Sequence, residues 1–191
     1  SGMIIYTPWQ LYQYYGDTRF LEEAYPAMKA YLGWLAGKAD ADHVVSWGLG
    51  DWIEVGVNSA PKRTSVAITS TCGYYLYADL LRRTAEFSAG LRTRLGELTA
   101  AIKTGFLKRF FNPETGLVGA VEDSQTAHVL PLYLGMIPDE KRELVRRRLV
   151  ANIHERKDHL STGFIGTLHL LLGLPQLGEA GLAHTIVTQR D

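Results

Sequence analysis

The sequence has almost no cysteine and no excess of charge of either sign. Cys72 is the single cysteine, so an internal disulfide is excluded. Its apolar and tyrosine-rich surroundings favour a small core residue over a nucleophile. The 20 acidic and 20 basic side chains cancel, whereas binding to phosphate backbones or anionic lipids requires a basic face. We therefore expect neither nucleic acid nor a membrane as a partner.

Several functional patterns are also missing. No run of about 18 apolar residues could span a membrane, and no signal peptide is present, so a complete chain would be cytoplasmic. There is no Gly-x-Gly-x-x-Gly or phosphate loop, and no Gly-x-Ser-x-Gly elbow. His154, Asp158 and His159 are spaced across a predicted helix end in a way that fixes no coordination geometry. We predict no cofactor and no metal site.

Helical periodicity is the dominant pattern. The chain of 191 residues is 46% hydrophobic, which is enough for a real core. One apolar face recurs at three-to-four spacing over Leu91, Leu95, Leu98, Ile102, Phe106 and Phe110. Strand alternation is weak, with at most a short extended piece around residues 117–121. The sequence therefore predicts an all-α fold of about eight helices in consecutive hairpins.

Glycine and proline predict where these helices begin and end. Gly16 should end a helix over residues 9–15, and Pro26 should break or restart the next one. Pro138, followed by two acidic residues, should open another. Further helices are expected over residues 65–88, 124–136, 164–174 and 176–189. Helical hairpins can stack into an open solenoid or close into a toroid, and the absence of a fixed-period repeat favours the toroid.

The most informative stretch is the loop over residues 47–54, which reads WGLGDWIE. A sugar can lay its apolar C–H face on an indole and hydrogen-bond its hydroxyls to a carboxylate. Trp52 and Asp51 therefore form a candidate carbohydrate site. The alternative is structural: the tryptophan would fill the core and the aspartate would cap the next element.

Short motifs in order along the chain resemble bacterial α-L-rhamnosidases of glycoside hydrolase family 78. They are Thr7-Pro8-Trp9, Tyr15-Gly16-Asp17, Tyr25-Pro26-Ala27-Met28, Gly50-Asp51-Trp52-Ile53, Thr69-Ser70-Thr71, Asp123-Ser124-Gln125-Thr126-Ala127, Leu160-Ser161-Thr162-Gly163-Phe164-Ile165-Gly166-Thr167, and Leu182-Ala183 with Thr188-Gln189-Arg190-Asp191. The resemblance runs from Met3 to Asp191. It implies an (α/α)6 barrel, inverting hydrolysis of terminal α-L-rhamnosides, and no obligatory metal.

The family's two catalytic segments do not occur in this sequence. The general acid is a Glu in an acid-rich Glu-Arg segment ending in Trp-x-Gly-Asp, and the general base is a Glu in Thr-x-Trp-Glu. His154-Glu155-Arg156 matches the first only by letters. We therefore assign no catalytic residue and expect the isolated chain to be inactive. Residues 1–191 are expected to be the central part of a six-hairpin catalytic domain, with Ser1 and Gly2 as a tag remnant and the toroid incomplete.

The resemblance and the loop chemistry together predict a substrate-binding site. It comprises Asp51, Trp52, Thr162, Gly163, Phe164 and Gln125. Trp52 would carry the sugar ring of a rhamnose-containing glycan, bound weakly, and Asp51 would orient the sugar or cap the loop. Glu54 is the nearest spare carboxylate, but its spacing from Asp51 does not make it a catalytic partner.

A second function class stays open, in which the chain is a helical module for protein interaction or self-association. Unpaired apolar helix faces predict a homo-oligomer through residues 3–15 and 176–189, or completion by missing chain segments. Trp52 discriminates between the two classes, because a sugar platform must stay partly exposed whereas a module would bury it.

Overall fold

The computed structural model describes residues 2–55, 63–85, 89–119 and 124–190, in which helices joined by loops are the main regular structure. The helices are α1 (Met3–Tyr15), α2 (Arg19–Ala36), α3 (Val66–Thr84), α4 (Ala89–Phe110), α5 (Gln125–Tyr133), α6 (Asp139–Glu155), α7 (Phe164–Gln176) and α8 (Ala180–Thr188). Extended pairing in the described part is limited to two isolated bridges, Ala39 with Val45 and Phe111 with Val118. The all-α prediction is confirmed.

The chain divides into two compact units. The first comprises residues 1–46 and 73–106, and the second comprises residues 47–72 and 107–191. The predicted sugar-site residues all belong to the second unit. None of the described helices combines the length and apolar character that a membrane span requires.

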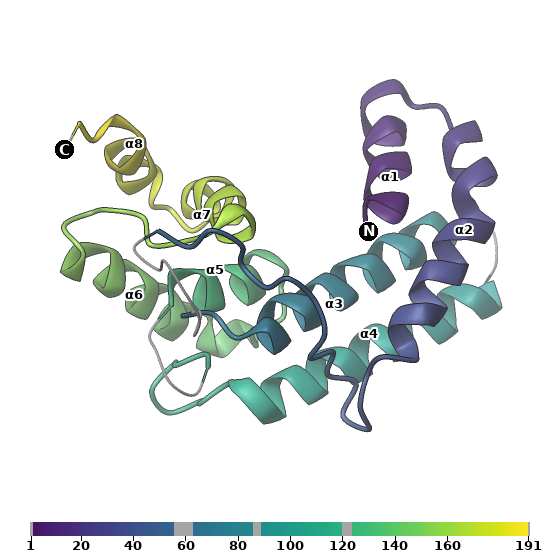
Figure 1. The fold of residues 1–191 in the computed structure, drawn as a ribbon, viewed down its shortest axis with the longest axis horizontal. Coiled ribbons are helices and arrows are strands. Elements are labelled where there is room, and N and C mark those ends of the chain that lie inside the picture. Colours follow the sequence, from purple (N-terminus) through teal and green to yellow (C-terminus); the bar gives the residue numbers. More distant parts are fainter. Residues whose placement is uncertain (1, 56–62, 86–88, 120–123, 191) are drawn as a thin grey trace. The chain divides into compact units, whose positions relative to one another are not determined.

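The first unit contains a helical hairpin. α1 and α2 run antiparallel and are joined by a short turn (Figure 1). Gly16 ends α1 in the left-handed region, with φ of 68°, and its N–H donates to the carbonyl oxygen of Tyr12. The helix thus ends at the predicted residue, although it begins at Met3 and not at residue 9.

The predicted break at Pro26 is wrong, because α2 continues through it from Arg19 to Ala36. Proline removes one helical hydrogen bond and crowds the preceding turn. Buried leucine and methionine side chains on both sides of Pro26, including Leu21 and Met28, pack the helix on the core and outweigh this cost. The core of the unit comprises Ile5, Met28, Leu32, Leu35, Val45, Tyr74, Ala78, Leu80, Leu81, Ala85, Leu95 and Ile102.

The second unit is organised around α5. Every residue from Gln125 to Leu132 is buried, because α5 packs against both α6 and α7 (Figure 1). Ser124 caps the helix by accepting a hydrogen bond from the N–H of Ala127. α8 packs in turn on α7. Two loops of this unit, residues 47–55 and 156–163, provide most of the candidate site.

The remaining predicted boundaries differ from the structure by a few residues. α3 is helical from Val66 to Thr84, and residues 86–88 of the predicted helix lie outside the described residues. The last predicted helix begins at Ala180 and not at residue 176, because α7 extends through Pro175 to Gln176. Of the extended piece at 117–121, Val118 pairs with Phe111, and residues 120 and 121 are not described.

Candidate functional site

Asp51 lies at the centre of the candidate site and is fully buried. Its Oδ1 accepts hydrogen bonds from the N–H groups of Ile165 at 2.9 Å and Gly166 at 3.0 Å. Its Oδ2 accepts from the N–H of Gly163 at 2.8 Å and from the hydroxyl of Thr126 at 2.5 Å. The three amides belong to the first turn of α7, where N–H groups have no partner within the helix. Asp51 therefore caps α7 from a loop 112 residues earlier in the chain.

The sequence left two interpretations open for this loop, a carbohydrate site and a structural loop, and these contacts bear on the second. Asp51 does cap a helix, but this helix is α7 and not the next element in the chain, α3, that the structural alternative predicted. The structural alternative for Trp52 is wrong, because the side chain is not in the core: the residue is 54% exposed. Direct contact between Asp51 and a sugar stays a prediction, and both carboxylate oxygens already accept hydrogen bonds from the protein.

Two glycines allow the loop to approach α7 this closely. A Cβ atom on Gly163 would lie 2.4 Å from the carbonyl oxygen of Trp52. A Cβ atom on Gly166 would lie 2.0 Å from the Thr126 hydroxyl and 2.7 Å from Asp51 Oδ2. Any larger residue would push the carboxylate away from its donors. The spacing of the two glycines in residues 162–167 thus serves the capping of α7.

Trp52 and Phe164 form an exposed aromatic pair. Their ring centroids are 5.8 Å apart and their planes meet at 83°, an edge-to-face contact. Phe164 is 63% exposed, and its N–H donates to the carbonyl oxygen of Trp52 at 3.0 Å. A second backbone bond runs from the N–H of Val55 to the carbonyl oxygen of Thr162 at 3.1 Å. The two loops are therefore joined directly at the rings.

The backbone next to the pair is strained. Ile53 has a φ of 56°, a region that a β-branched residue rarely adopts. Such strain persists only where surrounding contacts impose it. The hydrogen bonds of Asp51, Trp52 and Val55 on either side of Ile53 supply those contacts.

Gln125 and Thr162 support the loop that precedes α7. The buried Gln125 side chain donates from Nε2 to the carbonyl oxygen of His159 at 3.0 Å and accepts at Oε1 from the N–H of Ser161 at 2.8 Å. The hydroxyl groups of Thr162 and Thr167 are 2.7 Å apart. These polar atoms are bonded to the protein, so sugar contacts by Gln125 and Thr162 stay predictions.

Glu54 is also buried, and it belongs to a separate part of the loop. Its two oxygens accept hydrogen bonds from the N–H groups of Arg63 at 2.8 Å and Thr64 at 2.9 Å. The hydroxyl of Thr64 in turn lies 2.5 Å from that of Ser124. Glu54 thus fixes the segment that leads into α3.

Sequence reasoning missed the role of Thr126. Its hydroxyl donates to Asp51 from the first turn of α5, which links α5, the loop and α7. A polar residue at the start of an otherwise apolar helix was the available signal. Without the long-range pairing of the loop with α7, that signal indicated only a helix start.

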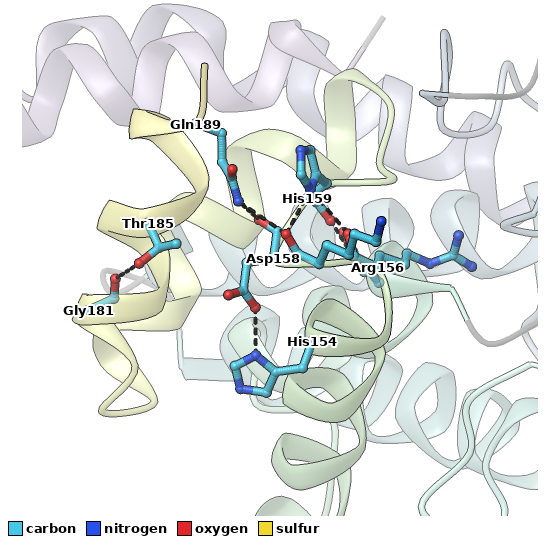
Figure 2. Close-up of polar contacts among 9 residues, drawn as sticks. His154, Arg156, Asp158, His159, Gly181, Thr185 and Gln189 are labelled. Atoms are coloured by element: carbon cyan, nitrogen blue, oxygen red, sulfur yellow. Dashed lines mark hydrogen bonds and ion pairs between the residues drawn. The ribbon is translucent and has the colours of Figure 1, made fainter. Parts of the chain in front are cut away.

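His154 lies in the last turn of α6, and Asp158 and His159 follow the end of that helix. Figure 2 shows the His154 ring facing Asp158, with Nδ1 2.5 Å from Oδ1. Lys157 and Asp158 both adopt positive φ, and the carbonyl oxygen of Lys157 accepts from Nε2 of Gln189 and lies 2.7 Å from Nδ1 of His159. These contacts fix the turn from α6 into the 156–163 loop. Among the described residues no three His, Cys, Asp or Glu side chains are grouped to hold a metal.

The chemical capacity of the site is that of a binding surface. Two exposed aromatic rings meet at a wide angle, and the backbone that carries them is fixed by a buried carboxylate. The two carboxylates of the 47–55 loop, Asp51 and Glu54, are buried and accept hydrogen bonds from backbone amides. Inverting glycoside hydrolysis requires two carboxyl groups that face the sugar from opposite sides, about 6.5–9.5 Å apart.

Comparison with known proteins gives a consistent result. The family model of the bacterial alpha-L-rhamnosidase six-hairpin glycosidase domain matches residues 1–191. The alpha-L-rhamnosidase of Streptomyces avermitilis is 33% identical over 183 residues, which cover 96% of this chain and 17% of the relative. One from Formosa agariphila is 28% identical and covers 98% of this chain and 20% of its own length. The chain spans about a fifth of the length of these relatives.

Solved structures agree. The alpha-L-rhamnosidase from Dictyoglumus thermophilum superposes with a TM-score of 0.91 at 34% identity, over 98% of this chain and 21% of that one. The Streptomyces avermitilis enzyme, solved in complex with L-rhamnose, gives 0.85 at 32% identity, over 96% and 17%. The helical hairpins described above, with the loop and α7 that they position, therefore belong to the bacterial α-L-rhamnosidase six-hairpin glycosidase family.

Proposed function

We propose that this chain forms part of the sugar-binding wall of an α-L-rhamnosidase, an inverting hydrolase of terminal α-L-rhamnosides. Residues 1–191 would be the central part of its catalytic domain. The observation that carries the proposal is the exposure of Trp52 beside Phe164, on a loop that the structure fixes at several points. A relative that is 32% identical has been solved with L-rhamnose bound, which supports rhamnose as the ligand class.

The geometry suits a small deoxy sugar. Rhamnose has a methyl group in place of one hydroxymethyl, so one edge of its ring is more apolar than that of most hexoses. The indole of Trp52 offers a flat face for the C–H groups of the ring, and Phe164 stands nearly perpendicular to it. The two rings thus present two apolar walls to one ligand.

Asp51, Gln125 and Thr162 are buried and hydrogen-bonded within the protein. We therefore assign them to support of the platform, with contact to the sugar left to the rings. Binding by a single apolar platform should be weak, in the millimolar range, or about −4 kcal/mol.

The experiment is a titration of the isolated chain with L-rhamnose, followed by tryptophan fluorescence, together with an assay of aryl α-L-rhamnoside hydrolysis. We expect saturable millimolar binding and no detectable turnover, because neither family carboxylate segment lies in this sequence. Turnover that persists through purification and is lost in Glu54→Gln would contradict the assignment of no catalytic residue.

A second candidate function is self-association, and exposed apolar side chains favour it. α1 exposes Met3, Ile4, Tyr14 and Tyr15, and Val187 is exposed on α8. Soluble monomers rarely leave large apolar patches uncovered. Light scattering at tens of micromolar should therefore show a homo-oligomer. A sharp monomer peak without binding of a hydrophobic dye would contradict this proposal and leave rhamnose binding untouched.

A further inference from the structure

We propose that Asp51 is a positioning residue for the aromatic pair, one that acts on the sugar only through Trp52 and Phe164. Its buried carboxylate would hold the loop that bears Trp52 against the helix start that bears Phe164, at the observed edge-to-face angle. The link to sugar affinity rests on the proposed function, whereas the control of the ring geometry by Asp51 does not.

The carboxylate is well placed for this role. Asp51 directly precedes Trp52 in the chain, and its partners Gly163 and Ile165 directly precede and follow Phe164. The N–H groups on both sides of Phe164 donate hydrogen bonds to the carboxylate of Asp51, the residue that precedes Trp52. The backbone positions from which the two rings project are therefore fixed relative to each other.

The negative charge of Asp51, and not only its shape, contributes to its interaction with the start of α7. A carboxylate at the first turn of a helix interacts favourably with the partial positive charge of the exposed N–H groups. Each Asp51 oxygen accepts two hydrogen bonds, from Ile165 and Gly166 on Oδ1 and from Gly163 and Thr126 on Oδ2. Charge-assisted bonds of this kind are stronger than neutral ones.

Asp51→Asn separates the two properties. The amide keeps the size of the carboxylate, but its NH2 group must replace one of the two oxygens. If the NH2 group replaces Oδ1, the N–H groups of Ile165 and Gly166 face another donor. If it replaces Oδ2, the N–H of Gly163 does so, while the Thr126 hydroxyl can turn and accept. Buried groups left without a partner are costly, so the first turn of α7 should move relative to the loop, and Phe164 should lose its fixed angle to Trp52.

Glu54 provides the matched control. It lies in the same loop, is buried, and accepts hydrogen bonds from two backbone amides, those of Arg63 and Thr64. Its partners lead into α3 and not α7. Glu54→Gln therefore perturbs a comparable carboxylate without touching the bonds that flank Phe164.

The experiment is fluorine NMR of the whole chain with its four tryptophans labelled as 5-fluorotryptophan. Trp52→Phe assigns the Trp52 resonance, and Phe164→Leu gives its position without the ring partner. We expect Asp51→Asn to move the Trp52 resonance toward the Phe164→Leu position and to weaken L-rhamnose binding about tenfold. Glu54→Gln should leave both unchanged.

Thr126→Val is a milder variant, because it removes one donor to Asp51 and keeps the side-chain shape. It should shift the Trp52 resonance part of the way, and Thr126→Ser should restore it. A folded Asp51→Asn chain with an unchanged Trp52 resonance would overturn the inference. If Asp51→Asn does not fold, an unchanged resonance in Thr126→Val overturns it. Failure of the wild-type chain to bind rhamnose would instead count against the proposed function alone.

Discussion

At the scale of single residues, burial controls the chemistry of Cys72. The thiol lies in the interior, as its apolar neighbours in the sequence predicted. Burial disfavours the charged thiolate and raises the pKa of Cys72 well above its ordinary value of 9.0. The thiolate is the reactive form, so the folded chain should not offer a nucleophile at this position.

We therefore predict that Cys72 reacts with a disulfide reagent at pH 8 only when the chain unfolds. The pKa of Cys72 is higher in the folded state than in the unfolded state. The stability that the buried neutral thiol contributes is therefore fully present below its ordinary pKa and is lost as the pH rises above that value. The rate at which the reagent labels Cys72, with and without denaturant, checks whether unfolding is required for the reaction. Rapid labelling of the native chain would contradict the burial.

The predicted sugar contacts at the site stay predictions, whereas the positions of the residues can be compared with the structure. Sugar chemistry directed attention to Asp51 and Trp52, and the structure places them beside Gly163 and Phe164. What the sequence could not supply was the direction of each side chain. The carboxylate of Asp51 points inward to backbone donors, whereas Trp52 points outward, and this distinction depends on the pairing of segments 112 residues apart.

At the scale of helices, one arginine connects α6 to the start of α8. Arg146 pairs with Glu143 at 2.7 Å on its own helix and with Glu179, the residue that precedes α8. The Arg146 guanidinium holds the pKa of Glu143 below its usual value of 4.5. Arg146 thus anchors the start of α8 on α6.

Arg146→Ala should therefore loosen α8, because Glu179 loses its partner across the two helices. Hydrogen exchange of the amides in Ala180–Thr188 should become faster. Arg147→Ala is the control, since Arg147 reaches Glu143 only at 3.6 Å and is more exposed. The folded-state pKa of Glu143 is lowered. The stability that its ion pair with Arg146 contributes is therefore present above about pH 4.5 and is lost as the pH falls. Equal exchange in both variants would contradict this account.

Helix positions could be predicted from local sequence better than helix ends. Apolar periodicity located α4, Pro138 with the two acidic residues after it located the start of α6, and Gly16 correctly ended α1. The break predicted at Pro26 is wrong, because packing of α2 on the core outweighs the tendency of proline to interrupt a helix. The N-terminus of α7 is capped by Asp51, a residue far away in sequence, so no local signal could reveal what holds it.

At the scale of the whole molecule, ordered short motifs carried more information than any single one. The resemblance drawn from them predicted the family that the comparisons show over residues 1–191. The all-α hairpins follow from periodicity. The absence of a fixed-period repeat favoured a toroid over a solenoid, and the resemblance implied its (α/α)6 form.

The function of this chain depends on whether Trp52 carries a sugar. The most direct measurement is the dissociation constant of L-rhamnose for the wild-type chain, Trp52→Ala and Trp34→Ala, with helicity confirmed for each. Trp34 is a suitable control because it is also partly exposed but belongs to α2 in the other unit. We predict millimolar binding that Trp34→Ala preserves and Trp52→Ala weakens beyond detection. Unchanged rhamnose binding in a folded Trp52→Ala chain would contradict the sugar-platform assignment and favour the interaction module.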